Sequence, residues 1–341
     1  MAQACFHSSV EGAQHGAKGL EGFLDFAKKA GAAGAQPSNF MLDGKSVSEI
    51  KAAFDARGLK IDGVSMHCPF WVHTTAWTCS PSIRPFISST LAKQSPAEIE
   101  QAMEKYILET MDKCVELGIK IIPMFWGVAF GWELASGYPW GFWAGGDFDL
   151  IKEGQERFIT KTQRIRDHAN QLGVYLAHEI HPGTGAMCAD DFNMLVDICG
   201  GDKCLTVNVD PSHCWEGEDW ETRFLKVADR CYGCHVKNHT VRKNLPLRAM
   251  EPNWPKRSMQ FTDLPSGDIN LVRFTELMIH VGYPQKYCQV MGTETAPLVV
   301  EAESAHRDLD ATSAGGVKYV NECLIFPVAS GSFEDGMGAD D

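Results

Sequence analysis

The chain has 341 residues, a formal net charge of −13 at pH 7 and an isoelectric point near 5.4. A nucleic-acid-binding surface requires a basic face, so this acidic balance argues against a nucleic-acid partner. The N-terminal segment shows no signal-peptide pattern, and no apolar run approaches the roughly 20 residues of a membrane helix. The 12 cysteines are scattered without a regular framework. We therefore expect a reduced, cytoplasmic protein with no membrane partner.

Short apolar strands alternate with amphipathic helices in the first half of the chain. Two helices begin with a capping box, in which a serine hydroxyl and a glutamate three residues later satisfy free backbone amides; these pairs are Ser46 with Glu49 and Ser95 with Glu98. The pattern predicts strands at residues 4–8, 34–37, 59–67 and 119–125, and helices at residues 19–30, from 46 onward and 95–118.

The second half of the chain continues the same alternation. It predicts strands at residues 174–180, 204–210, 231–236 and 287–293, and helices at residues 149–172, 190–199, 219–228, 268–281 and 304–323. About eight strand–helix units in succession favour a parallel sheet that closes on itself. We predict a single (β/α)8 barrel over residues 1–325, with long rim loops after strands four and seven and an acidic tail at residues 326–341.

Polar side chains concentrate where four of the predicted strands end, and a barrel enzyme places its chemistry on that rim. The four segments are His178–Gly183, Asn208–His213, His235–His239 and Thr293–Thr295. In chain order they offer a glutamate, an aspartate, a histidine and a glutamate. A set of three carboxylates and one imidazole suits Mn, Mg or Co better than Zn or Fe.

These four segments resemble the metal-binding strand ends of the xylose isomerase-like superfamily, which includes tagatose 3-epimerase, inosose dehydratase and hydroxypyruvate isomerase. The resemblance extends over nearly the whole chain and implies a homo-oligomer, a dimer or tetramer. It implies that His213 lies near metal and substrate, and that His67 is the rim histidine of the third strand. It also implies one divalent metal ion, with Mn favoured, bound by Glu179, Asp210, His235 and Glu294.

The chemistry that follows is proton abstraction next to a carbonyl. A metal that chelates the carbonyl and a neighbouring hydroxyl stabilises the developing enediolate, while two carboxylates remove and return the proton. We expect Glu179 and Glu294 to be that pair, as the matching glutamates are in family epimerases. His213 would polarise an oxygen, and Lys237, two residues beyond His235, would bind an anionic oxygen.

Several residues are expected to contact the substrate, although each has a structural alternative. His181 is a substrate contact or supports a metal ligand, and His239 is a contact or a solvated loop residue. The full set of expected contacts is His67, Trp126, His181, His213, Lys237, His239 and Arg242. Cys231 and Cys234 form a CxxC, but they lie inside a predicted strand without a second pair, so we interpret them as buried thiols.

Two long loops set the chain apart from small barrels. The first, at residues 126–147, is rich in aromatic residues, namely Phe130, Trp132, Tyr138, Trp140, Phe142 and Trp143. The second, at residues 241–265, is rich in basic ones, including Arg242, Lys243, Arg248, Lys256 and Arg257, and also carries Trp254. The loops are either a substrate lid or a subunit contact. As a lid, the aromatics favour a substrate larger than a triose or tetrose, such as a glycoside.

Three classes of function compete. The first is a metal-dependent sugar isomerase or epimerase, which we favour. The second is a metal-dependent lyase that dehydrates a keto-polyol or cleaves a 3-oxo-glycoside, since both reactions begin with the same proton abstraction. The third is an apurinic endonuclease, which needs further metal-binding histidines. Strand four ends in Pro123-Met124-Phe125-Trp126 and no Asp-x-His follows His235, so this class is disfavoured.

Overall fold

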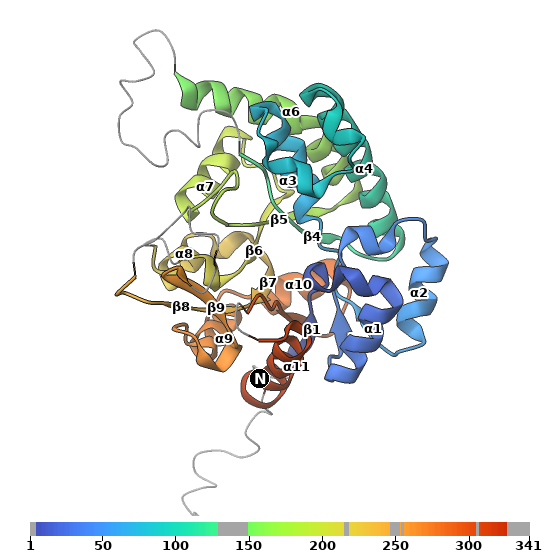
Figure 1. Cartoon of the computed structure of the whole chain (residues 1–341), viewed down its shortest axis with the longest axis vertical. Helices are drawn as coiled ribbons and strands as arrows, with labels where there is room; N and C mark the ends of the chain where they lie inside the picture. The colour runs from blue at the N-terminus through green and yellow to red at the C-terminus, as the bar shows by residue number, and fades with distance from the viewer. Residues whose placement is uncertain are drawn as a thin grey trace, which may run out of the picture.

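Eight parallel strands close into a barrel in the described part of the chain (Figure 1). The structure, a computed structural model, describes residues 5–128, 149–214, 218–245, 253, 256–304 and 307–325. The barrel strands are β1 (Phe6–Val10), β2 (Gly34–Ala35), β3 (Lys60–Ile61), β4 (Ile121–Met124), β5 (Tyr175–Glu179), β6 (Leu205–Val209), β7 (Cys231–Val236) and β10 (Ala296–Val300). This architecture confirms the predicted (β/α)8 barrel.

Backbone hydrogen bonds connect the strands around the whole barrel. Six strands are paired in the order β1-β10-β7-β6-β5-β4. The amide of Gln36 donates to the carbonyl oxygen of Val10 at 2.9 Å, which joins β2 to β1, and β2 pairs with β3. The amide of Met66 donates to Pro123 at 2.8 Å and links the segment after β3 to β4. All eight carboxyl ends therefore meet at one rim.

Helices surround the strands, as Figure 1 shows. They are α1 (Gly19–Ala30), α2 (Val47–Asp55), α3 (His67–Thr75), α4 (Pro96–Glu116), α6 (Leu150–Leu172), α7 (Ala189–Ile198), α8 (Trp220–Lys226), α9 (Leu271–His280), α10 (Tyr283–Met291) and α11 (Leu309–Tyr319), which a π turn at Val320–Leu324 extends. Both predicted capping boxes, Ser46 with Glu49 and Ser95 with Glu98, are present. Among the described helices, none is both long and apolar enough to cross a bilayer.

The strands are buried on both faces because side chains fill the barrel and helices cover its outside. All five residues of β1, β6 and β10 are buried. One apolar cluster extends from Phe6 to Leu324 and unites the strands with their helices. This continuous core explains why chain segments far apart in sequence can hold functional groups at fixed positions on the rim.

The prediction of the last strand is wrong. Residues 287–293 belong largely to α10, and the strand β10 follows at Ala296–Val300. A short apolar run fits a buried strand or a buried helix equally well. Two helix signals outweigh it here: Pro284 lies in the first turn, and Gly292 ends the helix with φ of 69°.

Three further differences concern loops and ends. The third strand is shorter than predicted, and His67 begins α3. The segment after β7 contains an antiparallel hairpin of β8 (Asn238–Val241) and β9 (Met259–Thr262). The acidic tail at residues 326–341, Arg248, Trp254 and the aromatic residues from Phe130 to Trp143 lie outside the described residues.

Candidate metal centre

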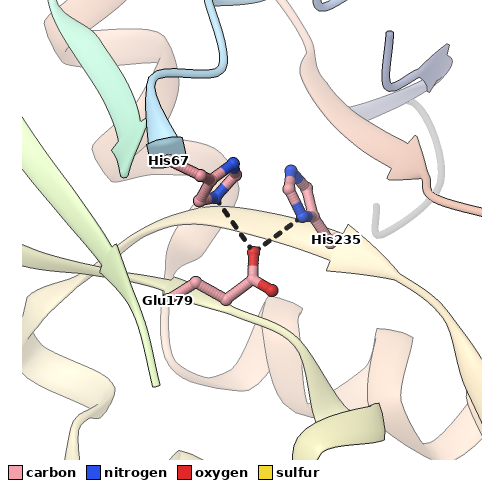
Figure 2. Close-up of side chains that lie close together, drawn as sticks. All are labelled: His67, Glu179 and His235. Carbon is pink, nitrogen blue, oxygen red and sulfur yellow. Dashed lines mark ion pairs between the residues drawn. The ribbon is translucent and has the colours of Figure 1, made fainter. Parts of the chain in front are cut away.

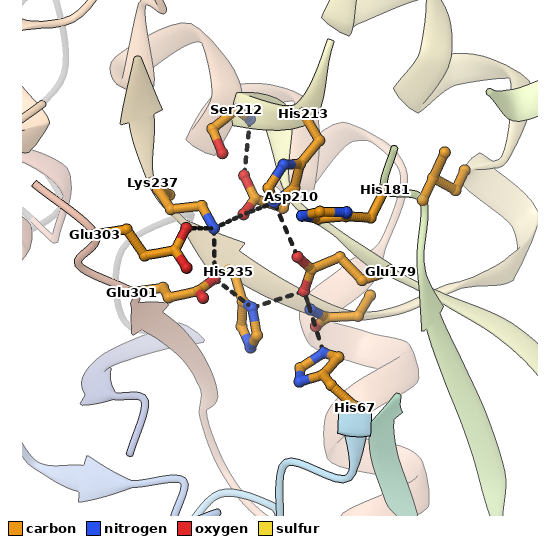
Figure 3. A network of polar contacts seen from close by, with 12 residues as sticks. His67, Glu179, His181, Asp210, Ser212, His213, His235, Lys237, Glu301 and Glu303 are labelled. Carbon is orange, nitrogen blue, oxygen red and sulfur yellow. Dashed lines mark hydrogen bonds and ion pairs between the residues drawn. The ribbon is translucent and has the colours of Figure 1, made fainter. Parts of the chain in front are cut away.

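Four side chains from four strand ends converge at the carboxyl-terminal rim (Figure 3). Glu179 is the last residue of β5, Asp210 directly follows β6, His235 lies in β7, and Glu301 directly follows β10. Each offers one ligand atom, and these four atoms all lie within 4.8 Å of one another. The parallel strands produce this convergence because they present successive carboxyl ends to the same space.

Glu301 takes the place that we predicted for Glu294. Glu294 is exposed and precedes β10, so it lies at the opposite end of that strand from the rim. The error follows from the misplaced last strand. The signal for Glu301 was present, since Ala296–Val300 is an unbroken apolar run followed at once by a carboxylate.

Hydrogen bonds from neighbouring strands orient the converging groups. Nε2 of His235 lies 2.9 Å from Oε1 of Gln36, so Nε2 carries the proton and Nδ1 faces the cluster. The Asn208 amide donates to Oε2 of Glu179 at 2.9 Å. The amide of Ser212 donates to Oδ1 of Asp210 at 2.7 Å, so the other oxygen, Oδ2, is the one that faces the cluster.

The donor atoms at the centre fit a cation. Nδ1 of His235 lies 2.8 Å from Oε2 of Glu179 and 3.1 Å from Oε2 of Glu301. Although these distances are short, Nδ1 of His235 and Oδ2 of Asp210 are buried without a hydrogen bond among the described residues. Buried polar atoms normally have a hydrogen-bond partner. Buried polar atoms that lack one and face a common point are expected of metal ligands. Three carboxylates and an imidazole suit a hard divalent ion.

His67, Glu179 and His235 form a second group of possible metal ligands, which shares two residues with the first (Figure 2). Nε2 of His67 lies 3.4 Å from Oε2 of Glu179, and Nδ1 lies 2.6 Å from the hydroxyl of Ser65. Nε2 of His213 lies 3.1 Å from Oε1 of Glu179 and 3.2 Å from Oδ2 of Asp210. Both histidines therefore contact the cluster.

Electrostatics keep the central carboxylates ionised. Burial alone would raise the pKa of Glu179, but the charge of His235 and the close approach of His213 and His235 hold it well below its ordinary value. Against the opposing effect of burial, Lys237 and His235 lower the pKa of Glu301. Burial would lower the pKa of His235, but the two glutamates raise it well above its ordinary value. Two glutamates are thus available as bases.

Lys237 is a buried cation beside the cluster. Its Nζ lies 3.3 Å from Oδ2 of Asp210, 2.9 Å from Oε2 of Glu301 and 3.0 Å from Oε2 of Glu303. The ammonium also lies 4.7 Å from the centre of the Phe261 ring. It balances the excess negative charge at this side of the rim and can donate a proton or a hydrogen bond to a substrate oxygen.

Sequence reasoning missed Glu11, which directly follows β1. This side chain is only 2% exposed, and its Oε2 accepts a 2.6 Å hydrogen bond from the amide of Ala13. Burial and the charge of Glu301 raise its pKa to about 8. Gln36, Asn208 and Glu303 were also missed, because none of them could be assigned to the site before the strand ends were placed in space.

The remaining expected substrate contacts divide into two groups. The ring of His181 lies 4.0 Å from that of His213, and Figure 3 shows the two side chains next to each other. Burial lowers the pKa of His181 to about 3. Burial likewise lowers the pKa of His239, and the charges of Asp268 and, to a smaller extent, Asp210 partly oppose this effect. His181 therefore adjoins the cluster through His213.

Trp126 and Arg242 are placed differently from our expectation. Trp126 is fully buried and packs edge-on against Phe70 and Phe158, at 5.2 and 5.3 Å, so it belongs to the core. Arg242 donates to Oε1 of Gln260 at 2.6 Å, across the β8–β9 hairpin. Nothing in these contacts brings either side chain to the four converging groups.

A family model for the xylose isomerase-like TIM barrel matches residues 24–312, well over half of the chain. The chain belongs to this family. No curated protein matches it.

Several solved structures share its fold. A 3-keto-D-glucoside 4-epimerase from E. coli has a TM-score of 0.61 at 12% identity, with 93% of this chain and 100% of that chain covered. A probable 3-DHS dehydratase from Bacillus anthracis has 0.58 at 15%, covering 93% and 99%. A family protein from Mycobacterium smegmatis, in complex with magnesium, has 0.56 at 16%, covering 90% and 88%. At these identities the likeness shows the fold alone.

Proposed function

We propose that the protein is a divalent-metal-dependent sugar isomerase or epimerase that removes a proton from the carbon beside a carbonyl. The observation that carries the proposal is the group formed by Glu179, Asp210, His235 and Glu301, whose ligand atoms lie within 4.8 Å of one another. Structural neighbours that are an epimerase and a probable dehydratase support a reaction of this kind.

These four residues would hold the cation, with Mn favoured and Mg, Co, Zn and Fe as the alternatives. A bound divalent ion would supply Lewis-acid polarisation of the substrate carbonyl. Because the Gln36 hydrogen bond leaves Nδ1 of His235 facing the cluster, that atom would be the single nitrogen ligand. Asp210 would serve mainly as a ligand, since Ser212 fixes its other oxygen.

The proton transfers are assigned to Glu179 and Glu301. Glu179, which is ionised, accepts the proton from the carbon beside the carbonyl, and the electron pair left behind forms an enediolate. Glu301 follows another strand; it takes a proton from the Lys237 ammonium, 2.9 Å away, and delivers it to the reacting carbon or to its neighbour. Solvent then receives the proton held by Glu179 and reprotonates Lys237. Return to the other face of the same carbon gives an epimer. Return to the neighbouring carbon, with transfer of the hydroxyl proton to the former carbonyl oxygen, gives an isomer. His213 hydrogen-bonds a substrate oxygen during both steps.

Lys237 favours a lyase as the second candidate. A buried ammonium 2.9 Å from Glu301 is positioned to protonate a leaving oxygen. In that reaction Glu179 removes the proton, the C–O bond on the adjacent carbon breaks, and Lys237 gives its proton to the departing hydroxyl or aglycone. The product is an unsaturated ketone. Glu303, 3.0 Å from Nζ, would keep the lysine protonated in the resting enzyme.

The test is a screen of ketoses, inososes and 3-oxo-glycosides with Mn-loaded protein in D2O, reading solvent deuterium uptake and product mass together. Isomerisation or epimerisation keeps the carbon skeleton and substituents, whereas elimination removes water or an aglycone. We expect Glu179→Gln to abolish deuterium uptake. Uptake that persists in this variant would contradict the role of Glu179. Metal content, measured separately by mass spectrometry, distinguishes a lost base from a lost ligand.

A further inference from the structure

An apolar cavity lies beside the candidate metal centre. It has a volume of about 270 Å³, and its walls include Trp71, Phe86, Phe125, His181, Pro182 and Thr184. Trp71 comes from α3, Phe125 directly follows β4, and the residues from His181 to Thr184 follow β5. The cavity therefore sits over neighbouring strand ends of the same rim.

Two of its walls are also neighbours of the four converging groups. The ring of Phe125 lies 4.2 Å from that of His67, and the ring of His181 lies 4.0 Å from that of His213. His67 and His213 in turn approach Glu179, at 3.4 and 3.1 Å. One aromatic ring thus lies between each of these walls and Glu179, which makes the cavity and the candidate metal centre neighbours on the same rim.

The polar groups in the cavity wall are largely engaged with one another. The indole N–H of Trp71 donates to the carbonyl oxygen of Gly183 at 3.0 Å. The hydroxyl of Thr184 lies 2.7 Å from the carbonyl oxygen of His181 and 2.9 Å from that of Ala186. Nδ1 of His181 donates to the carbonyl oxygen of Pro182 at 2.7 Å. What the wall offers a ligand is mainly ring surface.

A bare sugar would be poorly accommodated here, because its hydroxyls would lose their water without gaining partners. An apolar ring would bury its faces against Trp71, Phe86 and Phe125 at no such cost. The size agrees: a dry apolar cavity of roughly 150 Å³ holds benzene, and a whole ligand site spans roughly 300–1,000 Å³. A cavity of about 270 Å³ is the size of one subsite.

We propose that this cavity is a subsite for an apolar, ring-sized substituent of the substrate, which is then a keto-sugar glycoside with the sugar at the metal centre and the aglycone between Trp71, Phe86 and Phe125. The assignment of the sugar end rests on the proposed function. Trp71 and Phe86, whose rings pack edge to face at 5.5 Å, would determine specificity for the aglycone.

The test compares phenyl and methyl 3-oxo-glucosides, which share the reacting carbon and differ only in the substituent. Deuterium uptake at that carbon gives kcat/KM for each with Mn-loaded protein. We expect phenyl to exceed methyl by about tenfold, from ring burial and aromatic contact. Phe86→Ala and Trp71→Ala should each reduce this ratio by at least about threefold. Equal rates for both glycosides in the natural protein would overturn the proposal.

Phe40→Ala is the matched control. Phe40 is 45% exposed and Phe86 is 52% exposed, and both lie in short 3-10 turns, but Phe40 is not in the cavity wall. This variant should retain the phenyl preference of the natural protein. A preference lost equally in Phe40→Ala and Phe86→Ala would overturn the proposal, because the effect would not belong to the cavity.

A binding measurement separates failure of the subsite from failure of the proposed function. Saturation-transfer NMR with phenyl and methyl glucosides, which carry no keto group, reports binding without chemistry. Phenyl-selective binding that is lost in Phe86→Ala and Trp71→Ala supports the subsite even if no keto-sugar exchanges deuterium. Deuterium exchange without any preference for phenyl over methyl in rate or binding would contradict the subsite but would still support the proposed function.

Discussion

Oε1 of Gln36 lies 2.9 Å from Nε2 of His235, while Nδ1 of the same ring faces Glu179 and Glu301. Gln36 directly follows β2 and His235 lies in β7, so a residue near the start of the barrel sets the tautomer of one near its end. The amide oxygen can only accept, which requires the proton on Nε2 and leaves the Nδ1 lone pair for a metal.

We predict that Gln36→Leu weakens Mn²⁺ binding by about 10- to 100-fold, because the imidazole loses its orienting partner. Competition titration with a fluorescent chelator measures the Kd. Gln163→Leu, at an exposed position on α6, is the control and should bind Mn²⁺ as the natural protein does. Unchanged affinity in Gln36→Leu would mean that the ring is held without this hydrogen bond.

Glu301→Gln and Glu294→Gln form a matched pair that tests which glutamate belongs to the site. Glu301 is in the converging group, whereas Glu294 is exposed before β10. We expect Glu301→Gln to weaken Mn²⁺ binding by at least about 100-fold, since a ligand is lost rather than only its partner. Glu294→Gln should alter neither metal binding nor deuterium uptake. The reverse result would restore the assignment made from the sequence.

This pair also marks how far the sequence could lead. Glu179, Asp210 and His235 were predictable because each follows or ends an unmistakable apolar strand. Glu301 was missed, although the apolar run before it gives the same signal, because the eighth strand was placed at residues 287–293, where α10 lies. Gln36 and Asn208 could not be assigned at all, since an amide gains its role only from the side chain that lies opposite it in space.

Gly233 allows Asn208 to reach Glu179. A methyl group added at Gly233 would lie 2.5 Å from Oδ1 of Asn208, too close for any real contact. We predict that Gly233→Ala destabilises the protein by about 1–3 kcal/mol and weakens Mn²⁺ binding by about tenfold, as Asn208 leaves Glu179. Urea unfolding and metal titration measure the two effects.

Gly315→Ala is the control for that substitution. Gly315 lies in α11 with no atom within 4 Å of an added methyl group. Alanine there should stabilise the protein by up to about 1 kcal/mol through helix propensity and leave Mn²⁺ affinity unchanged. A loss of affinity equal to that of Gly233→Ala would show that the effect is not transmitted through Asn208.

The buried imidazole of His73 predicts sensitivity to acid. Burial, with a smaller effect of Lys161, lowers its pKa from 6.5 to about 3. At pH values between about 3 and 6.5, His73 binds a proton in the unfolded chain but not in the folded chain. The free energy of unfolding therefore falls as the pH falls below 6.5. His73→Leu should remove up to about 1.4 kcal/mol per pH unit of this slope.

Urea unfolding at several pH values below 6.5 measures that slope. Val72→Ala, at the adjacent fully buried position in α3, is the control. It should lower the free energy of unfolding by a similar amount at every pH, because no titrating group is removed. Parallel curves for His73→Leu and the natural protein would contradict the prediction.

The pairing of β1 with β10 closes the barrel by joining its first strand to its last. Glu301 directly follows the last strand, β10, whereas Gln36, which orients His235, directly follows β2, next to the first strand. A cation bound at the centre would therefore stabilise the closed barrel, because its binding free energy would add to the free energy of pairing β1 with β10. A fragment that stops before residue 296 keeps three of the four ligands but leaves β1 and β7 as open edges. The affinity for the metal ion therefore indicates whether β10 has paired with these two strands.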